Sequence, residues 1–301
     1  MSAVDLEYVR NVQLASFEDH GGLAAALEVA NNKMASIPVL NSDDTGVAGV
    51  SGRFTSALMQ LKDPVNQTDV LESMLFAQLA ASAKYNAFDD PPRWYDTFVY
   101  LSIGASWLDS RSTLLPKADT NFGQATLSGN KVAVKDLVVA FLKSAGVDQA
   151  SKDLIYSLSL PGASRASTIF NHSAAKARAS TFSLSTIKQI SDDVYCTRTE
   201  NPSGHDSQVT HFLAGGSFYF TASFDVKDVL FVSVDKSSAE FFQSRFTSIL
   251  SIPGYEKIRQ AVKDRIKNQA IVSRTKLAGA TQPSLSVQQN YIAQAPLASA
   301  P

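Results

Sequence analysis

The first half of the chain is dominated by apolar residues at helical spacing. They recur every three or four positions over residues 21–37 and again over 47–61, and Pro or Asp-Pro interrupts each run, which predicts two helices. Asp69 precedes Glu72 by three residues, the spacing of a capping box, and predicts the start of a third helix. Asp90 is expected to cap a fourth helix, because the two prolines that follow it suit a first turn.

The second half changes to the alternation that is typical of strands. Residues 121–134 alternate around Ser-Gly-Asn, which predicts a short hairpin, and residues 136–144 and 148–158 predict two helices. From Thr181 onward we expect β-structure.

Four stretches carry this β pattern. Residues 194–200 and 208–213 flank an Asn-Pro-Ser-Gly turn, and residues 218–224 alternate aromatic with polar side chains. Residues 229–234 are apolar on both faces, which predicts a strand in the centre of the sheet.

Two helices are predicted near the C-terminus. Ser237 and Glu240 form a capping box that is expected to open the first. The second follows a Pro-Gly pair, and its apolar stripe is wide enough to pack on a sheet: Tyr255, Ile258, Val262 and Ile266. A row of cations lies beside the stripe, one turn apart: Arg259, Lys263 and Lys267.

These patterns predict an α+β fold, in which an N-terminal helical layer packs on a mostly antiparallel sheet in the C-terminal half, with two C-terminal helices and a flexible arm. We expect a single domain over residues 1–276, helical over 1–160 and sheet-rich over 180–276. Residues 277–301 contain no charge and are rich in Ala, Gln, Ser and Pro, so this segment is the expected arm.

Composition limits the function classes. The formal net charge of −1 argues against a dedicated nucleic-acid binder, because contacts with phosphate groups supply most of the affinity of such proteins. The N-terminus has no basic-then-apolar succession, which predicts no signal peptide and synthesis in the cytoplasm. A single cysteine excludes an internal disulfide and a Cys-rich zinc site, and the four histidines show no metal-ligand spacing, so no metal or other cofactor is expected.

The basic row allows two interpretations. Arg259, Lys263 and Lys267, with Arg274 and Lys276 beyond, would suit contact with an anionic membrane surface, where each cation contributes about 1 kcal/mol. The alternative is the solvated face of a packed helix.

Cys196 also has competing interpretations. It lies two residues after Val194, on one face of a predicted strand, where a free cysteine is usually a small buried hydrophobe. It could instead carry a fatty acyl group, or act as a nucleophile if His205 or His211 supplied a base. A Ser-x-x-Lys pattern from Ser173 to Lys176 lacks the companion motifs of serine acyltransfer enzymes.

The layout of helices first, sheet and helices after, and one thiol in the stretch Asp193-Val194-Tyr195-Cys196-Thr197, resembles the Erwinia virulence factor type of insect-gut colonisation proteins. The resemblance implies a leaderless α/β protein with a palmitoyl group on the cysteine that corresponds to Cys196.

Three functional hypotheses follow. The preferred one is a non-enzymatic, virulence-associated or toxin-like protein, released by a leaderless route, that acts at a host membrane through covalent palmitate on Cys196 and the basic row. The second is a structural protein that forms homo-oligomers through residues 277–301. The third is a thiol or serine hydrolase that uses Cys196 or Ser173.

Overall fold

The computed structural model describes residues 6–16, 46–51, 53–59, 64–105, 107–109, 122–144, 155, 165–190, 210–250 and 252–279. The helices, in chain order, are α1 (Leu6–Asn11), α4 (Pro64–Ser82), α5 (Pro91–Gly104), α6 (Val134–Ser144), α8 (Arg165–Ala174) and α9 (Ile252–Gly279). The strands are β1 (Gly46–Ser51), β2 (Phe54–Met59), β3 (Trp107–Asp109), β4 (Gly123–Gln124), β5 (Val132–Ala133), β6 (Ala175–Lys176), β7 (Ala179–Ile190), β8 (Thr210–Ala222), β9 (Ser233–Val234) and β10 (Ala239–Leu250).

The main sheet has the strand order β1-β2-β7-β8-β10-β3, with β4 paired to β10 and β6 to β7. Long antiparallel ladders join β7 to β8 and β8 to β10, while β2 runs parallel to β7. Phe182 lies opposite Phe218, and Phe220 opposite Phe241, so aromatic cross-strand pairs stabilise the central ladders. The sheet is mostly antiparallel, and the α+β class is confirmed.

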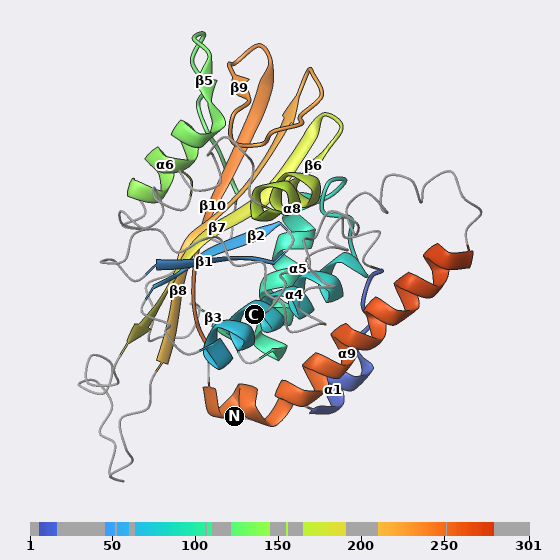
Figure 1. Cartoon of the computed structure of the whole chain (residues 1–301). Helices are drawn as coiled ribbons and strands as arrows, with labels where there is room; N and C mark the ends of the chain where they lie inside the picture. Colours follow the sequence, from blue (N-terminus) through green and yellow to red (C-terminus); the bar gives the residue numbers. More distant parts are fainter. Residues whose placement is uncertain are drawn as a thin grey trace, which may run out of the picture.

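Helices lie on both sides of the main sheet (Figure 1), and each face of the sheet has its own hydrophobic core. Alternate side chains of β7 belong to different cores, because successive side chains of a strand point to opposite faces of the sheet. Phe182 and Leu184 face α6 and α8, whereas Ile187 belongs to the core that includes α4, α5 and α9. The molecule is therefore a sheet between two helical layers.

Two predictions for the first half meet different outcomes. The fourth helix is confirmed as α5, and Asp90 Oδ1 accepts a hydrogen bond of 3.3 Å from the backbone N–H of Arg93. The helix predicted over residues 47–61 is wrong, because β1 and β2 form an antiparallel pair there. Phe54 of β2 is paired with Ser183, more than a hundred residues away, and such long-range pairing overrides a helical pattern. The helix predicted over 21–37 lies outside the described residues.

The helix predicted from Ser237 is also wrong, because the chain there enters the long strand β10. Ser237 and Ser238 donate their backbone N–H groups to Asp235 Oδ1, so the polar signal belongs to a tight turn rather than a helix cap. Phe242 of β10 stacks on Tyr219 of β8 with ring centroids 4.5 Å apart. The chain therefore has one described C-terminal helix, α9, instead of two.

Other boundaries differ as well. Residues 121–134 do not form a hairpin, because β4 pairs with β10 and β5 pairs with β9. The expected central strand over 229–234 is reduced to β9, which lies in a separate two-stranded sheet. Residues 277–279, the start of the predicted arm, belong to α9, and the rest of that segment lies outside the described residues. The helix predicted over 136–144 is confirmed as α6, whereas the one over 148–158 falls almost wholly outside the described residues.

Candidate functional site

The helix α4 occupies the middle of the larger core and is enclosed on all sides. Every residue from Asp69 to Ala81 is buried, including Glu72 and Gln78. Most of these residues are apolar, and the helix is buried around its whole circumference, so it has no side in contact with water. The two carboxylates of its first half are therefore unusual, since charged side chains are rarely fully buried unless they are paired.

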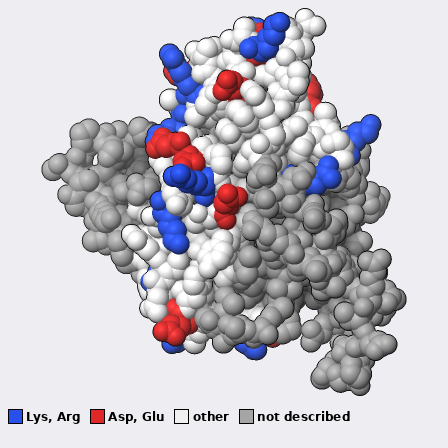
Figure 2. Space-filling view, turned by 180° about the vertical axis from the view of Figure 1, so that it is seen from behind, with Lys and Arg blue, Asp and Glu red and all other residues white. Residues whose placement is uncertain are grey.

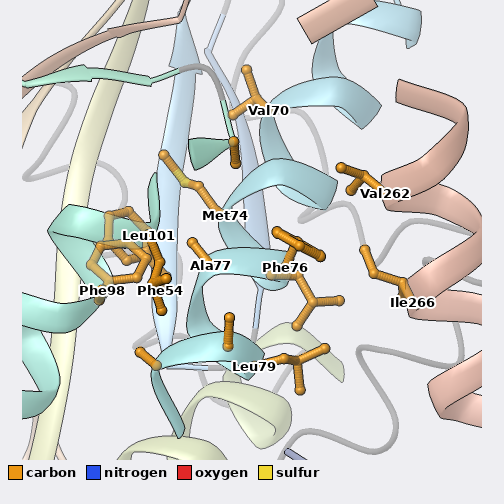
Figure 3. Packing of buried hydrophobic residues seen from close by; sticks show 14 of the residues in the cluster. Phe54, Val70, Met74, Phe76, Ala77, Leu79, Phe98, Leu101, Val262 and Ile266 are labelled. Carbon is orange, nitrogen blue, oxygen red and sulfur yellow. The ribbon is translucent and has the colours of Figure 1, made fainter. Parts of the chain in front are cut away.

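The helix α9 packs along α4 and α1 and covers these carboxylates. Its stripe of Tyr255, Ile258, Val262 and Ile266 is at most 2% exposed. Val262 and Ile266 point toward Phe76 and Leu79 of α4, while Phe54, Phe98 and Leu101 lie on the other side of that helix (Figure 3). The stripe itself was predicted correctly, but it packs on helices rather than directly on the sheet.

We call the interface between α4 and α9 the seam, and the pair of Asp69 and Arg259 is its central contact. The Arg259 Nε donates to both carboxylate oxygens of Asp69, at 2.9 and 3.0 Å, and its Nη2 donates to Oδ2 at 2.6 Å. Asp69 has no exposed surface, whereas the Arg259 side chain is 27% exposed. The bond to Asp69 raises the pKa of Arg259, so the guanidinium stays charged. Asp69 is therefore a buried anchor and not the helix cap that its spacing predicted; α4 begins at Pro64.

Glu72 and Lys263 form a looser second pair, one turn further along. The Lys263 Nζ lies 3.8 Å from Glu72 Oε2, which is too far for a good hydrogen bond, and that oxygen has no hydrogen-bond partner within the described part of the chain. Burial raises the pKa of Glu72 to about 7, opposed by the nearby positive charge of Lys263. Burial also raises the pKa of the Tyr255 phenol, whose oxygen is enclosed in the same seam. The seam thus contains a carboxyl group that titrates near neutral pH.

The cations of the basic row lie in the seam at the start of the row and are exposed to solvent at its end. Arg259 is held by three hydrogen bonds and Lys263 by a long ion pair, while Lys267 is exposed and forms no ion pair with any residue that the structure describes. Residues four apart are separated by about 40° around a helix, which explains this drift. On the face shown in Figure 2, basic and acidic side chains of the described residues are interspersed in small groups.

The segment that carries Cys196, residues 191–209, lies outside the described residues, but its two ends are placed. It leaves β7 after Ile190 and enters β8 at Thr210, which are paired. His211, the next residue, is paired with Leu250, the last residue of β10, and α9 begins at Ile252. The connection therefore leaves the sheet at the same end at which α9 begins.

The remaining candidate residues do not assemble into a described catalytic group. His205 lies within 191–209, and the side chain of His211 is likewise outside the described part of the structure. Ser173 is 1% exposed near the end of α8, whereas Lys176 is exposed in β6.

None of the helices that the structure describes is both long and apolar enough to cross a membrane. The described residues also contain no group of three or more His, Cys, Asp or Glu side chains placed to hold a metal ion.

Sequence reasoning missed the acidic half of the seam. Asp69 and Glu72 are separated by one turn of α4, and Arg259 and Lys263 by one turn of α9, so the two helices present complementary charges at matching intervals. The arrangement fixes the register of α9 on α4 and keeps a titratable carboxyl group at their interface.

Comparisons with known proteins give similarity only at the level of solved structures. No protein-family model and no curated protein matches the chain. The chain is similar to a solved structure of the Evf virulence factor, with 10% sequence identity and a TM-score of 0.36, over 81% of this chain and 88% of that one. It is also similar to a delta-endotoxin with 10% identity and a TM-score of 0.29, over 71% of this chain and 86% of that one.

Proposed function

We propose that the protein is a non-enzymatic, toxin-like protein that acts at an anionic membrane surface. In this proposal, a fatty acyl chain on Cys196 and the basic row Arg259, Lys263 and Lys267 provide the two contacts. One acyl chain alone binds membranes only marginally, so a second, electrostatic contact is required.

The observation that supports the proposal is that the connection containing Cys196 and helix α9 share one end of the main sheet. The connection that contains Cys196 and the first turn of α9 leave the sheet at the same end, through the register of Thr210, His211 and Leu250. This shared end of the sheet supports a membrane contact in which a lipid on that connection and the cations of α9 act together.

Helix α9 is expected to contact the membrane without leaving α4. Burial of Ile258, Val262 and Ile266 stabilises the docked helix by about 5–9 kcal/mol, at about 1.5–3 kcal/mol for each side chain. Three cations near anionic lipid gain only about 3 kcal/mol. The attraction to anionic lipid is therefore too weak to detach α9 from α4. Membrane contact must use the exposed end of the basic row, where Lys267 lies.

The first experiment measures the intact mass of the protein from bacterial and insect-cell hosts. A mass gain equal to a fatty acyl chain, lost on hydroxylamine treatment and absent in Cys196→Ser, is the expected result. Unmodified protein from both hosts would remove the lipid from the proposal.

The second experiment measures sedimentation with phosphatidylserine-containing and phosphatidylcholine-only vesicles. We expect binding to the anionic vesicles that weakens with salt, and a loss of about fivefold in Lys267→Gln, which corresponds to about 1 kcal/mol. Lys143→Gln is the matched control, because Lys143 is an exposed lysine on α6, on the other face of the sheet. Equal binding to both vesicle types, or equal loss in both variants, would contradict the electrostatic contact.

A further inference from the structure

The N-terminal segment formed by residues 8–16 lies against α9, and we call this segment the strap. It includes the end of α1, which lies beside the middle of α9 (Figure 1). Val9 and Leu14 are buried in the larger core. The strap therefore reaches α9 as a packed part of the fold.

Hydrogen bonds tie the strap to both helices of the seam. The backbone N–H of Ala15 donates to the carbonyl oxygen of Leu79 in α4 at 2.9 Å. From α9, Gln269 Nε2 donates to the carbonyl oxygen of Ala15 at 2.9 Å, and Arg265 Nη2 donates to the carbonyl oxygen of Val12. Because Ala15 is bonded to α4 and α9 at once, the strap joins the two helices beyond the ion pairs of the seam.

The contacts of the strap leave some buried polar atoms without a hydrogen-bond partner among the described residues. These atoms are the hydroxyl oxygen of Tyr8 and Nε of Arg265. Burial, with a smaller contribution from Tyr100, raises the pKa of Tyr8 to about 12, so its hydroxyl is neutral and keeps its proton. A buried donor without a partner costs free energy in the packed state. The strap is therefore released more easily than a contact in which every buried donor is paired.

Tyr8 also fixes the strap against α5. Its ring lies so close to Gly104 that a Cβ at that position would be 2.3 Å from Tyr8 Cε1. A side chain at position 104 must therefore displace the Tyr8 ring. Such a substitution loosens the strap without changing the sequence of the strap or of α9.

The second half of α9, which the strap contacts, is basic. Residues 265–279 contain no acidic residue, and their cations are Arg265, Lys267, Arg274 and Lys276. In the docked helix, Arg265 Nη2 donates to a neutral backbone carbonyl, and no carboxylate among the described residues pairs with this guanidinium. A helix segment with cations and no acids is attracted to anionic lipid. The charge of residues 265–279 is thus complementary to an anionic membrane surface.

We propose that the strap is an autoinhibitory contact: residues 8–16 hold residues 265–279 of α9 to α4, and release of the strap allows this basic segment to bind an anionic membrane. The inference rests on the proposed membrane function and adds a control to it. With the strap in place, the membrane meets only the exposed end of the basic row at Lys267. With the strap released, Arg265 becomes available as a further cation.

The test uses full-length variants that loosen the strap and leave α9 unchanged. Gly104→Ala displaces the Tyr8 ring, and Ala15→Pro removes the N–H that donates to Leu79. Hydrogen–deuterium exchange of residues 265–279 should become about tenfold faster than in the wild type, while exchange in α6, on the other face of the sheet, should not change.

Sedimentation with phosphatidylserine-containing vesicles measures the second effect of the same variants. Binding should increase about fivefold over the wild type, and the increase should disappear at high salt. Gly123→Ala is the matched control, because the nearest atom to a Cβ at that position is 4.0 Å away, and it should match the wild type in both measurements.

Tyr8→Phe changes the strap in the opposite direction and keeps the test decisive if the loosened variants fold poorly. It removes the buried hydroxyl that has no partner, so exchange of residues 265–279 should slow and vesicle binding should fall below that of the wild type. Unchanged exchange in all three variants would overturn the inference, and so would faster exchange with vesicle binding at the wild-type level. Failure of the proposed function differs, because neither the wild type nor any variant would then sediment with anionic vesicles; that result would overturn both.

Discussion

Glu72 makes the stability of this protein depend on pH in a direction that is unusual for a carboxylate. Its pKa in the folded state is about 7, raised by burial from an ordinary value of 4.5. The folded state therefore holds the proton more tightly than the unfolded state does. The stabilisation is complete below pH 4.5 and is lost as the pH rises through 7, where an ionised carboxylate must remain buried.

The size of this effect follows from the two pKa values. A difference of about 2.5 units corresponds to on the order of 3 kcal/mol, lost between about pH 4.5 and pH 7.5. Lys263 opposes the loss, but its Nζ is 3.8 Å from Glu72 and its side chain is 33% exposed, so the attraction is weakened by solvent. Burial is the larger cause, and the net sign is destabilisation with rising pH.

Glu72→Gln isolates this contribution from the other titrating groups. The amide has nearly the shape of the protonated acid, so the two proteins should have similar free energies of unfolding at pH 5. At pH 8 the Gln variant should be more stable than the wild type by on the order of 3 kcal/mol. Urea unfolding at half-unit steps of pH measures the difference.

Glu256→Gln is the matched control for the same seam. Glu256 lies 4.0 Å from Arg259, but its side chain is 58% exposed, so its substitution should change stability little at any pH. A difference between Glu72→Gln and wild type that stays flat from pH 5 to pH 8 would refute the burial argument. A wild type that gains stability relative to the variant as the pH rises would show that the pair with Lys263 dominates.

Three further predictions concern the seam, the sheet and the arm. Arg259→Met should lower the free energy of unfolding in urea by about 3–5 kcal/mol, because it leaves Asp69 buried and unpaired. Asp69→Asn should lower it by only about 1–3 kcal/mol, since the side chain of Arg259 is 27% exposed and can reach water. Equal losses in the two variants would contradict this asymmetry. Gly215→Ala should destabilise the fold by about 1–3 kcal/mol, because a Cβ there would lie 2.3 Å from the Leu184 carbonyl oxygen in β7, while the control Gly123→Ala, whose nearest contact is 4.0 Å, should be neutral in the same assay. Deletion of residues 280–301 should abolish any oligomer in size-exclusion chromatography and leave the circular dichroism spectrum unchanged if the arm mediates self-association; persistence of the oligomer would exclude that role.

Local signals predicted some elements well and failed where distant strands decide the structure. Asp90 and the prolines after it determine the start of α5 through contacts within one turn, so the sequence was sufficient. The residues of β10 carry paired phenylalanines that fit a helical period equally well, and the strand is selected by its pairing with β8. The hairpin of β1 and β2 depends in the same way on Phe54 and its parallel neighbour β7.

The seam shows which part of a site a helical projection can provide. Projection of α9 identified its apolar stripe and the cations beside it, but not what covers them, because Asp69 and Arg259 are 190 residues apart in the sequence. A signal was nevertheless present in α4. Asp69 and Glu72 stand on one face of a segment that is otherwise uncharged and mostly apolar, and carboxylates in such a segment must be paired if it is buried. Cations that pair with both carboxylates need the same one-turn spacing, and Arg259 and Lys263 on α9 have that spacing. The spacing of Asp69 and Glu72 was therefore evidence for a buried basic partner as much as for a helix cap.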